Sequence, residues 1–462
     1  MAEKKESGRG QIITFYSYKG GSGRTMALVN TACLLAREKN KKILVIDWDL
    51  EAPGVHRYFD SEAGRSEQKR TEIFRIDDGW PGLIELFMSL RDQLAKKKER
   101  SADSILKVIK DAQLDKYFTK VIEPSLFVLK AGIFDHDYAE KVNQFNWFDF
   151  YNRTPEFFSV FASYLERKFD YILIDSRTGI SDSSGICTMI MPEKIVPVFT
   201  PNKQSMDGVL SVMKRAVDYR MGSSDLRPLG IFPLPSRIEM AENDLREVWR
   251  KGNKAVNISG YQSEFEALLS QAYQLTDCDL KAYFDDVQIQ HVPKYSYGES
   301  IAVLEEMLED NLSLTRSYKM FTEKLTGQKN IWETSPFKVF ISYNKDDRDY
   351  VTELRKHLTH QNLVVSTLDT IKTGEEWGKA VLKNIQDSDI MVSVVSGSSI
   401  NSSIHAYEAG LARSAGKKVI SIVTDSTIGN VPIYMESTPS IQSEETHMNQ
   451  VVKQIVAAMN KK

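Results

Sequence analysis

The chain is poor in cysteine, has no long apolar run and carries no marked excess of charge. Its 462 residues include three scattered cysteines, Cys33, Cys187 and Cys278, whose spacing fits neither a disulfide framework nor a metal-ligand motif. No apolar run approaches the roughly 20 residues that cross a bilayer, and the charged N-terminal tail is unlike a signal peptide. The 60 basic and 63 acidic residues provide no basic field for nucleic acid or membranes. We therefore expect a cytoplasmic protein with no membrane and no nucleic-acid partner.

The clearest local signal is a glycine-rich turn between an apolar, β-rich run and an amphipathic helix, within residues 12–36. Glycines let the backbone bend tightly and bring successive N–H groups close to an anion. The helix that follows adds the positive end of its dipole, and a threonine hydroxyl at its start can bind a metal ion. The turn therefore predicts a polyphosphate cradle made by Lys19, Gly20, Gly21, Ser22, Gly23, Arg24 and Thr25.

Aspartates end two further apolar runs. The run ILVI precedes Asp47 and Asp49, and the run YILI precedes Asp175. Short continuous apolar runs are typical of strands buried on both faces of a parallel sheet, and ligands bind at the carboxyl ends of such strands. Because side chains alternate along an extended segment, Asp47 and Asp49 can face one site. A capping or turn role is the alternative for these two residues.

The order of these motifs resembles the ParA/MinD-type family of P-loop ATPases, whose phosphate loop has an early lysine (K-G-G-x-x-K-[ST]). That family pairs two subunits around two ATP molecules, so the resemblance implies ATP and Mg²⁺ as cofactors and ATP-dependent self-association as a dimer or higher assembly. Lys19 would reach the partner's phosphates, while Arg24 replaces a lysine by a planar fork. The resemblance assigns Asp49 to the attacking water and the magnesium shell to Thr25, Asp47 and Asp175.

Two more segments fit the same resemblance. Arg177 follows the third motif and is a candidate for the phosphates or the partner subunit, with a structural salt bridge as the alternative. The segment TPNKQS lacks the aspartate of a guanine-reading motif, so adenine is favoured over guanine. Related proteins wrap the adenine further along the chain, where this sequence has Pro235, Ser236 and Arg237.

The order of strands and helices predicts an α/β fold with two domains. Residues 1–325 alternate strand runs with helical stretches, which predicts a doubly wound, mostly parallel sheet with a helical insertion at 60–165. Helices are expected at 83–98 and 154–168 within that insertion. Residues 326–336 are polar and end in proline, so they are interpreted as a linker. Residues 337–462 again alternate short strands with helices, which predicts a smaller flavodoxin-like domain.

The C-terminal segment contains FISY at 340–343, an Asp-Gly-Trp loop at 369–377, the strand SDIMVSVVS, and a serine six residues before Glu408. In combination, these pieces resemble TIR domains. Some TIR domains cleave the N-glycosidic bond of NAD, and others only assemble with further TIR domains. The catalytic kind needs a carboxylate on the third helix, where this chain has Glu408. The resemblance implies that NAD is the substrate and that its binding residues are Ser342, Tyr343, Asn344, Trp377 and Ser402.

Two interpretations from different functional classes remain. The first is a nucleotide-regulated NAD-cleaving enzyme in which Glu408 stabilises the ribosyl cation, with a role in bacterial anti-phage defence or stress signalling implied by the resemblance. Tyr343 and Trp377 would stack on the nicotinamide ring. The second is a signalling scaffold that the ATPase switches, in which Glu408 is a solvated helix carboxylate.

Overall fold

The computed structural model describes most of the chain: residues 9–38, 41–60, 76–97, 100–122, 125–222, 229–296, 298–306, 313–327, 330–332, 337–361, 363–367, 377–400, 402–425, 439–443 and 448–460. The described residues divide into two compact units. One lies within 1–216, 229–265 and 280–332, and the other within 217–228, 266–279 and 333–462.

The first unit is built on an eight-stranded, mostly parallel sheet of order β3-β4-β2-β5-β1-β6-β7, with β8 paired to β6. Its strands are β1 (Gln11–Tyr16), β2 (Ile43–Asp47), β3 (Thr119–Ile122), β4 (Leu126–Leu129), β5 (Tyr171–Asp175), β6 (Lys194–Phe199), β7 (Gly230–Ile231) and β8 (Leu234–Pro235). Among the strand pairs of this sheet that the structure describes, β3–β4 alone is antiparallel. The apolar runs that predict β2 and β5 lie in its centre, where these strands are buried on both faces.

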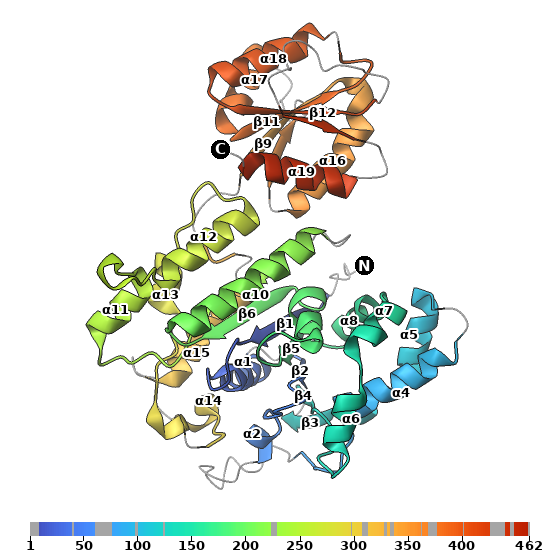
Figure 1. Cartoon of the computed structure of the whole chain (residues 1–462), viewed down its shortest axis with the longest axis vertical. Helices are drawn as coiled ribbons and strands as arrows, with labels where there is room; N and C mark the ends of the chain where they lie inside the picture. Colours follow the sequence, from blue (N-terminus) through green and yellow to red (C-terminus); the bar gives the residue numbers. More distant parts are fainter. Residues whose placement is uncertain are drawn as a thin grey trace, which may run out of the picture. The chain divides into compact units, whose positions relative to one another are not determined.

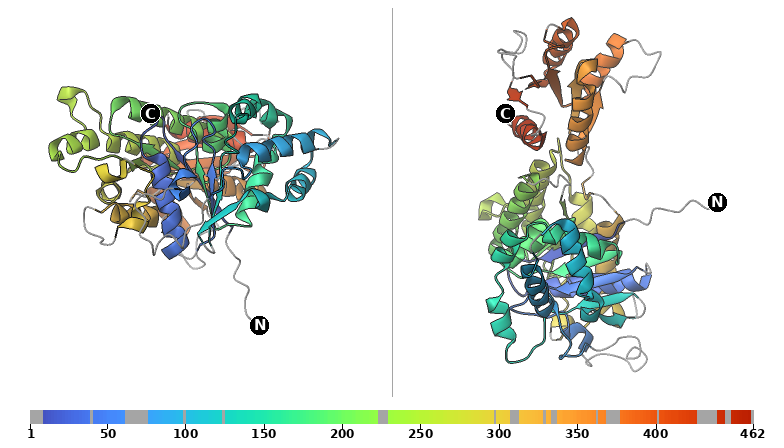
Figure 2. Two further views of the ribbon diagram at one scale, coloured as in Figure 1. Left: turned by 90° about the horizontal axis from the view of Figure 1, so that it is seen from below. Right: turned by 90° about the vertical axis from the view of Figure 1, so that its right-hand side faces the viewer.

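Helices cover both faces of this sheet (Figures 1 and 2). Phe15 of β1 packs edge-on against Phe321 of helix α15 (Leu314–Gly327), which itself contacts α1 (Arg24–Glu38). Ile12 of the same strand belongs to a core cluster on the other face, with α4 (Leu83–Ala95) and α8 (Phe157–Glu166). This two-sided cover confirms the predicted doubly wound arrangement.

The region 60–165 contributes strands as well as helices. Besides α4 and α8 it holds α5 (Ala102–Asp111), α6 (Tyr138–Gln144) and α7 (Trp147–Arg153), and Phe87 of α4 lies at the centre of their aromatic cluster. The sequence predicts no strand here, yet β4 pairs in parallel with β2 and β3 pairs with β4. Each of these strands has only four residues, too few for a distinct periodic pattern.

The other α-helices among the described residues are, in chain order, α2 (Arg57–Asp60), α9 (Asp182–Gly185), α10 (Lys203–Gly222), α11 (Asn243–Lys251), α12 (Tyr261–Tyr273), α13 (Lys281–Asp286), α14 (Ala302–Glu305), α16 (Arg348–His360), α17 (Trp377–Asp387), α18 (Ser403–Ser414) and α19 (Met448–Asn460). Among the helices of the described residues, none has the length and apolar content that a membrane crossing requires.

The C-terminal sheet is wholly parallel and has the order β10-β9-β11-β12-β13. Its strands are β9 (Lys338–Ser342), β10 (Val364–Thr367), β11 (Ile390–Val395), β12 (Lys418–Val423) and β13 (Ser440–Gln442). Helices α16 and α19 pack on one face, and α17 and α18 pack on the other (Figure 1). The strand order 2-1-3-4-5 is that of flavodoxin-like folds, which confirms the predicted class.

Candidate functional sites

The glycine-rich turn joins β1 to α1, and its conformation depends on two glycines. Gly21 has a φ of 77° and Gly23 a φ of 82°, a region that residues with a Cβ rarely adopt. A Cβ built on Gly23 would also lie 3.0 Å from Oγ of Ser236, so the predicted adenine-pocket segment reaches the turn. Pro235 ends β8, and Arg237 is exposed with a left-handed φ of 55°.

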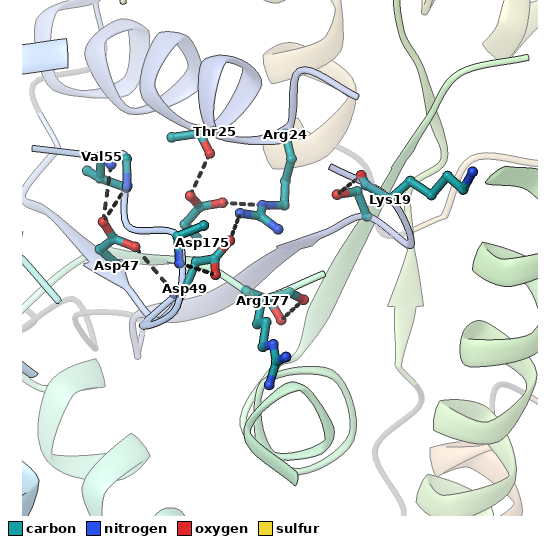
Figure 3. Close-up of polar contacts among 12 residues, drawn as sticks. Lys19, Arg24, Thr25, Asp47, Asp49, Val55, Asp175 and Arg177 are labelled. Atoms are coloured by element: carbon teal, nitrogen blue, oxygen red, sulfur yellow. Dashed lines mark hydrogen bonds and ion pairs between the residues drawn. The ribbon is translucent and has the colours of Figure 1, made fainter. Parts of the chain in front are cut away.

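Arg24, at the start of α1, points into a group of buried carboxylates (Figure 3). Its Nε lies 2.5 Å from Oδ1 of Asp175, and its Nη2 lies 2.8 Å from Oδ2 of Asp49. Thr25 donates to the other oxygen of Asp175 across 2.7 Å. Burial raises the pKa of Asp175, and the Arg24 charge opposes that rise. The structure thus brings together four of the predicted site residues, Arg24, Thr25, Asp49 and Asp175.

Asp47 is fully buried and is held by backbone donors. Its Oδ2 accepts the amides of Gly54 and Val55, each at 3.1 Å, and its Oδ1 accepts the amide of Asp49 at 3.3 Å. Burial and the charge of Asp175 raise its pKa well above the usual range. These contacts match the turn role that the sequence left open, because they hold the loop after β2 in place.

Lys19 and Arg177 lie apart from this carboxylate group. Lys19 is exposed and points away from the aspartates in Figure 3, and its Nζ donates a hydrogen bond to Oε1 of Gln204. Arg177 Nη2 lies 2.5 Å from Glu51 Oε2, which is the salt bridge that the sequence left as an alternative.

The side-chain oxygen atoms near the phosphate turn could supply part of the coordination shell of Mg²⁺. Thr25 Oγ1 and Asp175 Oδ2 lie side by side, and Mg²⁺ commonly binds through one or two carboxylates plus substrate phosphates. Within the described residues, no group of three His, Cys, Asp or Glu side chains is placed to hold a metal by itself. A magnesium ion here would therefore need phosphate oxygens as further ligands.

In the second unit, Glu408 of α18 is buried against the end of β9. Its side chain is 0% exposed, Ser342 donates a hydrogen bond to Oε2, and Oε1 has no partner among the described residues. Burial raises the pKa of Glu408 to about 7, against the opposing hydrogen bond from Ser342. A carboxyl group with a strongly shifted pKa and an unused oxygen is typical of functional sites.

The other predicted NAD-binding residues have different surroundings in the second unit. Asn344 Nδ2 donates to the Ser398 carbonyl at 3.0 Å, beside the carboxyl ends of β9 and β11. Tyr343 is 8% exposed and belongs to the core cluster between the sheet and helices α16 and α19. Ser402 caps α18 by accepting the amide of His405. The predicted loop at 369–376 and the Trp377 side chain lie outside the described residues.

One polar residue near Glu408 was not predicted to have a role. His405 lies one helical turn before Glu408 on α18, is 2% exposed, and its Nδ1 has no partner among the described residues. Burial lowers its pKa, so the ring stays neutral at pH 7. Its three-residue spacing from Glu408 was the available signal, since residues three apart share a helix face.

Two domain families match this chain. Residues 10–220 match the AAA domain family, and residues 339–450 match the TIR domain family. No curated protein matches the chain.

Solved structures of ParA/MinD-type ATPases are similar to the first unit. The cell division ATPase MinD of Pyrococcus furiosus is 17% identical, with 69% of this chain and 100% of that chain covered and a TM-score of 0.40. MinD of Pyrococcus horikoshii, solved with Mg-ADP, is 17% identical, with coverages of 69% and 96% and a TM-score of 0.40. A ParA family ATPase of Chlorobium tepidum is 16% identical, with coverages of 67% and 98% and a TM-score of 0.38. The chain thus carries a segment of the AAA domain family followed by one of the TIR domain family, and its motifs resemble those of a ParA/MinD-type P-loop domain joined to a C-terminal TIR domain.

Proposed function

We propose that this protein is a nucleotide-regulated NAD glycohydrolase, with an ATP-binding domain at 1–325 and a catalytic TIR domain at 337–462. The observation that carries the proposal is Glu408: a carboxyl group of raised pKa, bonded to Ser342 and with one oxygen unused. The resemblance to TIR domains implies a role in bacterial anti-phage defence or stress signalling, in which loss of NAD would stop metabolism.

The proposed reaction breaks the bond between the nicotinamide nitrogen and C1′ of the ribose. The bonding electron pair leaves with nicotinamide, which becomes neutral and needs no acid to leave. The ribosyl group becomes an oxocarbenium-like cation, and water then attacks C1′ and loses a proton. Ionised Glu408 stabilises the cation through charge and through hydrogen bonds from ribose hydroxyls. Because the pKa of Glu408 is about 7, cleavage should increase as pH rises through neutrality.

The first unit would control this reaction by binding ATP. The turn amides supply donors for phosphate oxygens, and so does the buried Nη1 of Arg24, which has no partner among the described residues. Thr25 and Asp175 would hold Mg²⁺, which neutralises phosphate charge when bound. Lys19 would contact the phosphates of a second copy, so that ATP promotes self-association and brings TIR domains together.

A second candidate is a scaffold whose TIR domain recruits partners without cleaving NAD. Glu408 is buried and not the solvated carboxylate first expected for a scaffold, but its burial still favours this candidate, because a ribose hydroxyl has no direct access to the carboxyl group among the described residues. The two candidates differ in a single measurable quantity, the consumption of NAD.

The deciding experiment follows NAD consumption by the purified full-length protein with and without ATP and Mg²⁺. Glu408→Gln keeps the shape of the side chain and removes its charge. Cleavage that depends on both Glu408 and ATP supports the enzyme and its regulation. Cleavage that survives in Glu408→Gln rejects Glu408 as the catalytic group, and cleavage without ATP rejects nucleotide control. If NAD persists under every condition while ATP-dependent assembly occurs, the scaffold is the better account.

A further inference from the structure

Two polar atoms on one face of α18 are buried and have no hydrogen-bond partner among the described residues. They are Nδ1 of His405, whose side chain is 2% exposed, and Oε1 of Glu408, whose side chain is 0% exposed. Residues three apart are neighbours on a helix surface, with Cβ atoms about 5–6 Å apart. Because a buried polar atom without a partner is costly, each of these two atoms is a candidate partner for the other.

Strand β9 anchors both side chains at one place on the sheet. Ser342, the last residue of β9, donates to Oε2 of Glu408. The backbone of the next residue, Tyr343, hydrogen-bonds the His405 ring and acts to raise its pKa, as a carbonyl acceptor does. Since the Cα atoms of consecutive residues are about 3.8 Å apart, the two anchoring groups are close together.

The hydrogen bond to Tyr343 decides which nitrogen of His405 is free to accept. Because Nδ1 has no partner, Nε2 makes that bond and carries the proton of the neutral ring. Nδ1 then presents a lone pair, which repels the oxygen of an ionised carboxylate but accepts a hydrogen bond from a protonated one. The two unpartnered atoms therefore fit one another when the proton lies on Glu408.

The other groups around the pair leave this arrangement intact. The charge of Asp347 favours a protonated ring, but burial outweighs it, and the pKa of His405 falls. Ser393 of β11 lies beside Ser342, and its hydroxyl also lacks a partner in the described part of the chain, so it is the rival partner for Oε1. The core neighbours of α18 on α17 and β11 are apolar: Val381, Ile385 and Met391.

We propose that His405 is a positioning residue for Glu408, whose protonated Oε1 donates a hydrogen bond to Nδ1 of the imidazole. In the proposed reaction, the water that attacks C1′ loses its proton to ionised Glu408. His405 then holds the protonated carboxyl group until solvent takes the proton. His405 and Ser342 act in opposite senses, since Ser342 favours the ionised form. The role in the reaction rests on the proposed function, whereas the hydrogen bond between the two side chains does not.

The test follows the ionisation of Glu408 in full-length protein without NAD, by carbon NMR of glutamate labelled at the side-chain carboxyl group. Exposed glutamates titrate at about pH 4.3, so a signal that titrates at about 7 and is missing in Glu408→Gln belongs to this residue. His405→Gln can still donate to the Tyr343 carbonyl but has no acceptor at the Nδ1 position, whereas His405→Asn keeps an acceptor there. We expect the pKa of Glu408 to fall by about one unit, or tenfold in the protonation constant, in His405→Gln and to stay near the parent value in His405→Asn.

Ser393→Ala is the matched control and should titrate as the parent does. An unchanged pKa in His405→Gln, an equal fall in both His405 variants, or a fall in Ser393→Ala alone would overturn the proposal. Nitrogen NMR of the parent tests the pair without a change at either residue. The Nδ1 signal of His405, identified by its absence in His405→Asn, should shift as Glu408 ionises, and this shift should be missing in Glu408→Gln. An Nδ1 signal that does not respond to the ionisation of Glu408 also rejects the pair.

The role in the reaction is tested separately, by the pH dependence of NAD consumption. The acid limb should move to lower pH in His405→Gln and return toward the parent position in His405→Asn. A limb that stays in place in His405→Gln, beside a shifted NMR titration, rejects only the role in the reaction. If the parent consumes no NAD at any pH, the proposed function fails, and the NMR titrations still decide whether the pair exists.

Discussion

Arg24 and Asp175 form a buried ion pair with Nε and Oδ1 2.5 Å apart, although 151 positions separate them in the chain. The pair joins the first residue of α1 to the last residue of β5, and Nη2 of the same guanidinium reaches Asp49. Arg24 is therefore the counter-charge of the carboxylate group as well as a candidate phosphate ligand. Phosphate oxygens at the turn would compete with the aspartates for this guanidinium.

Replacing Arg24 by alanine should destabilise the first unit strongly. The change leaves Asp49 and Asp175 buried without a counter-charge, and breaking a buried pair in this way costs about 3–5 kcal/mol. Urea unfolding measures the loss. Arg177→Ala is the matched control, because its pair with half-exposed Glu51 is worth about 1 kcal/mol or less. Equal effects of the two variants would contradict the role of Arg24 as the counter-charge.

The sequence predicts the centre of the first unit well and its periphery poorly. Strands β2 and β5 are continuous apolar runs, and the aspartates that end them meet at one edge of the sheet, as expected. The partners of these aspartates depend on tertiary packing. The position of Arg24 in the motif predicts phosphate contact but carries no information on Asp175, which approaches from a distant strand. The four-residue strands β3 and β4 are too short to be distinguished from loops.

In the second unit, the sequence predicts the position of Glu408 on its helix but not its burial. The parallel, flavodoxin-like sheet of this unit is predicted by the alternation of strand runs and helices, and Glu408 is predicted by the resemblance to TIR domains. Whether a helix carboxylate is solvated or buried depends on which face meets the sheet. The structure places Glu408 inward against Ser342, and the neighbouring His405 with it.

Glu408→Gln should make the second unit less sensitive to pH. The pKa of Glu408 is raised from 4.5 to about 7 in the folded protein, so the folded state binds the proton more tightly than the unfolded state. The native protein therefore loses stability as pH rises from about 4.5 to 7, by up to roughly 3 kcal/mol. The glutamine variant lacks this loss, so its stability relative to that of the parent should be higher at pH 8 than at pH 5.

Denaturation at both pH values measures this difference. Glu353→Gln on α16 serves as the control, because Glu353 is about half exposed and faces Lys356 and His357. A parallel pH dependence in the parent and Glu408→Gln would show that Glu408 does not titrate in this range.

Ser342→Ala should move the acid limb of NAD cleavage to higher pH. The Ser342 hydroxyl donates to Glu408 and favours its ionised form, so removal of the hydroxyl raises the pKa of Glu408 further. Rates measured between pH 5.5 and 9 should therefore rise later in the variant. Ser393→Ala is the control, since Ser393 lies beside Ser342 on β11 and its hydroxyl has no partner among the described residues. A limb displaced equally in both variants would assign the shift to a general change in the sheet.

Lys19→Ala should abolish ATP-dependent self-association without lowering the stability of the isolated chain. Lys19 is exposed and lies apart from the carboxylate group, and its ammonium donates to the exposed side chain of Gln204, so loss of the lysine side chain leaves no buried group unpaired. In the proposed assembly its ammonium faces the phosphates of the second copy, where loss of one charge-assisted contact is felt at both sites of a symmetric pair. Sedimentation with a non-hydrolysable ATP analogue measures the association. Lys203→Ala, an exposed lysine at the start of α10, is the matched control and should associate normally. If Lys19→Ala associates as well as Lys203→Ala does, the lysine acts within its own subunit and the proposed pairing geometry is wrong.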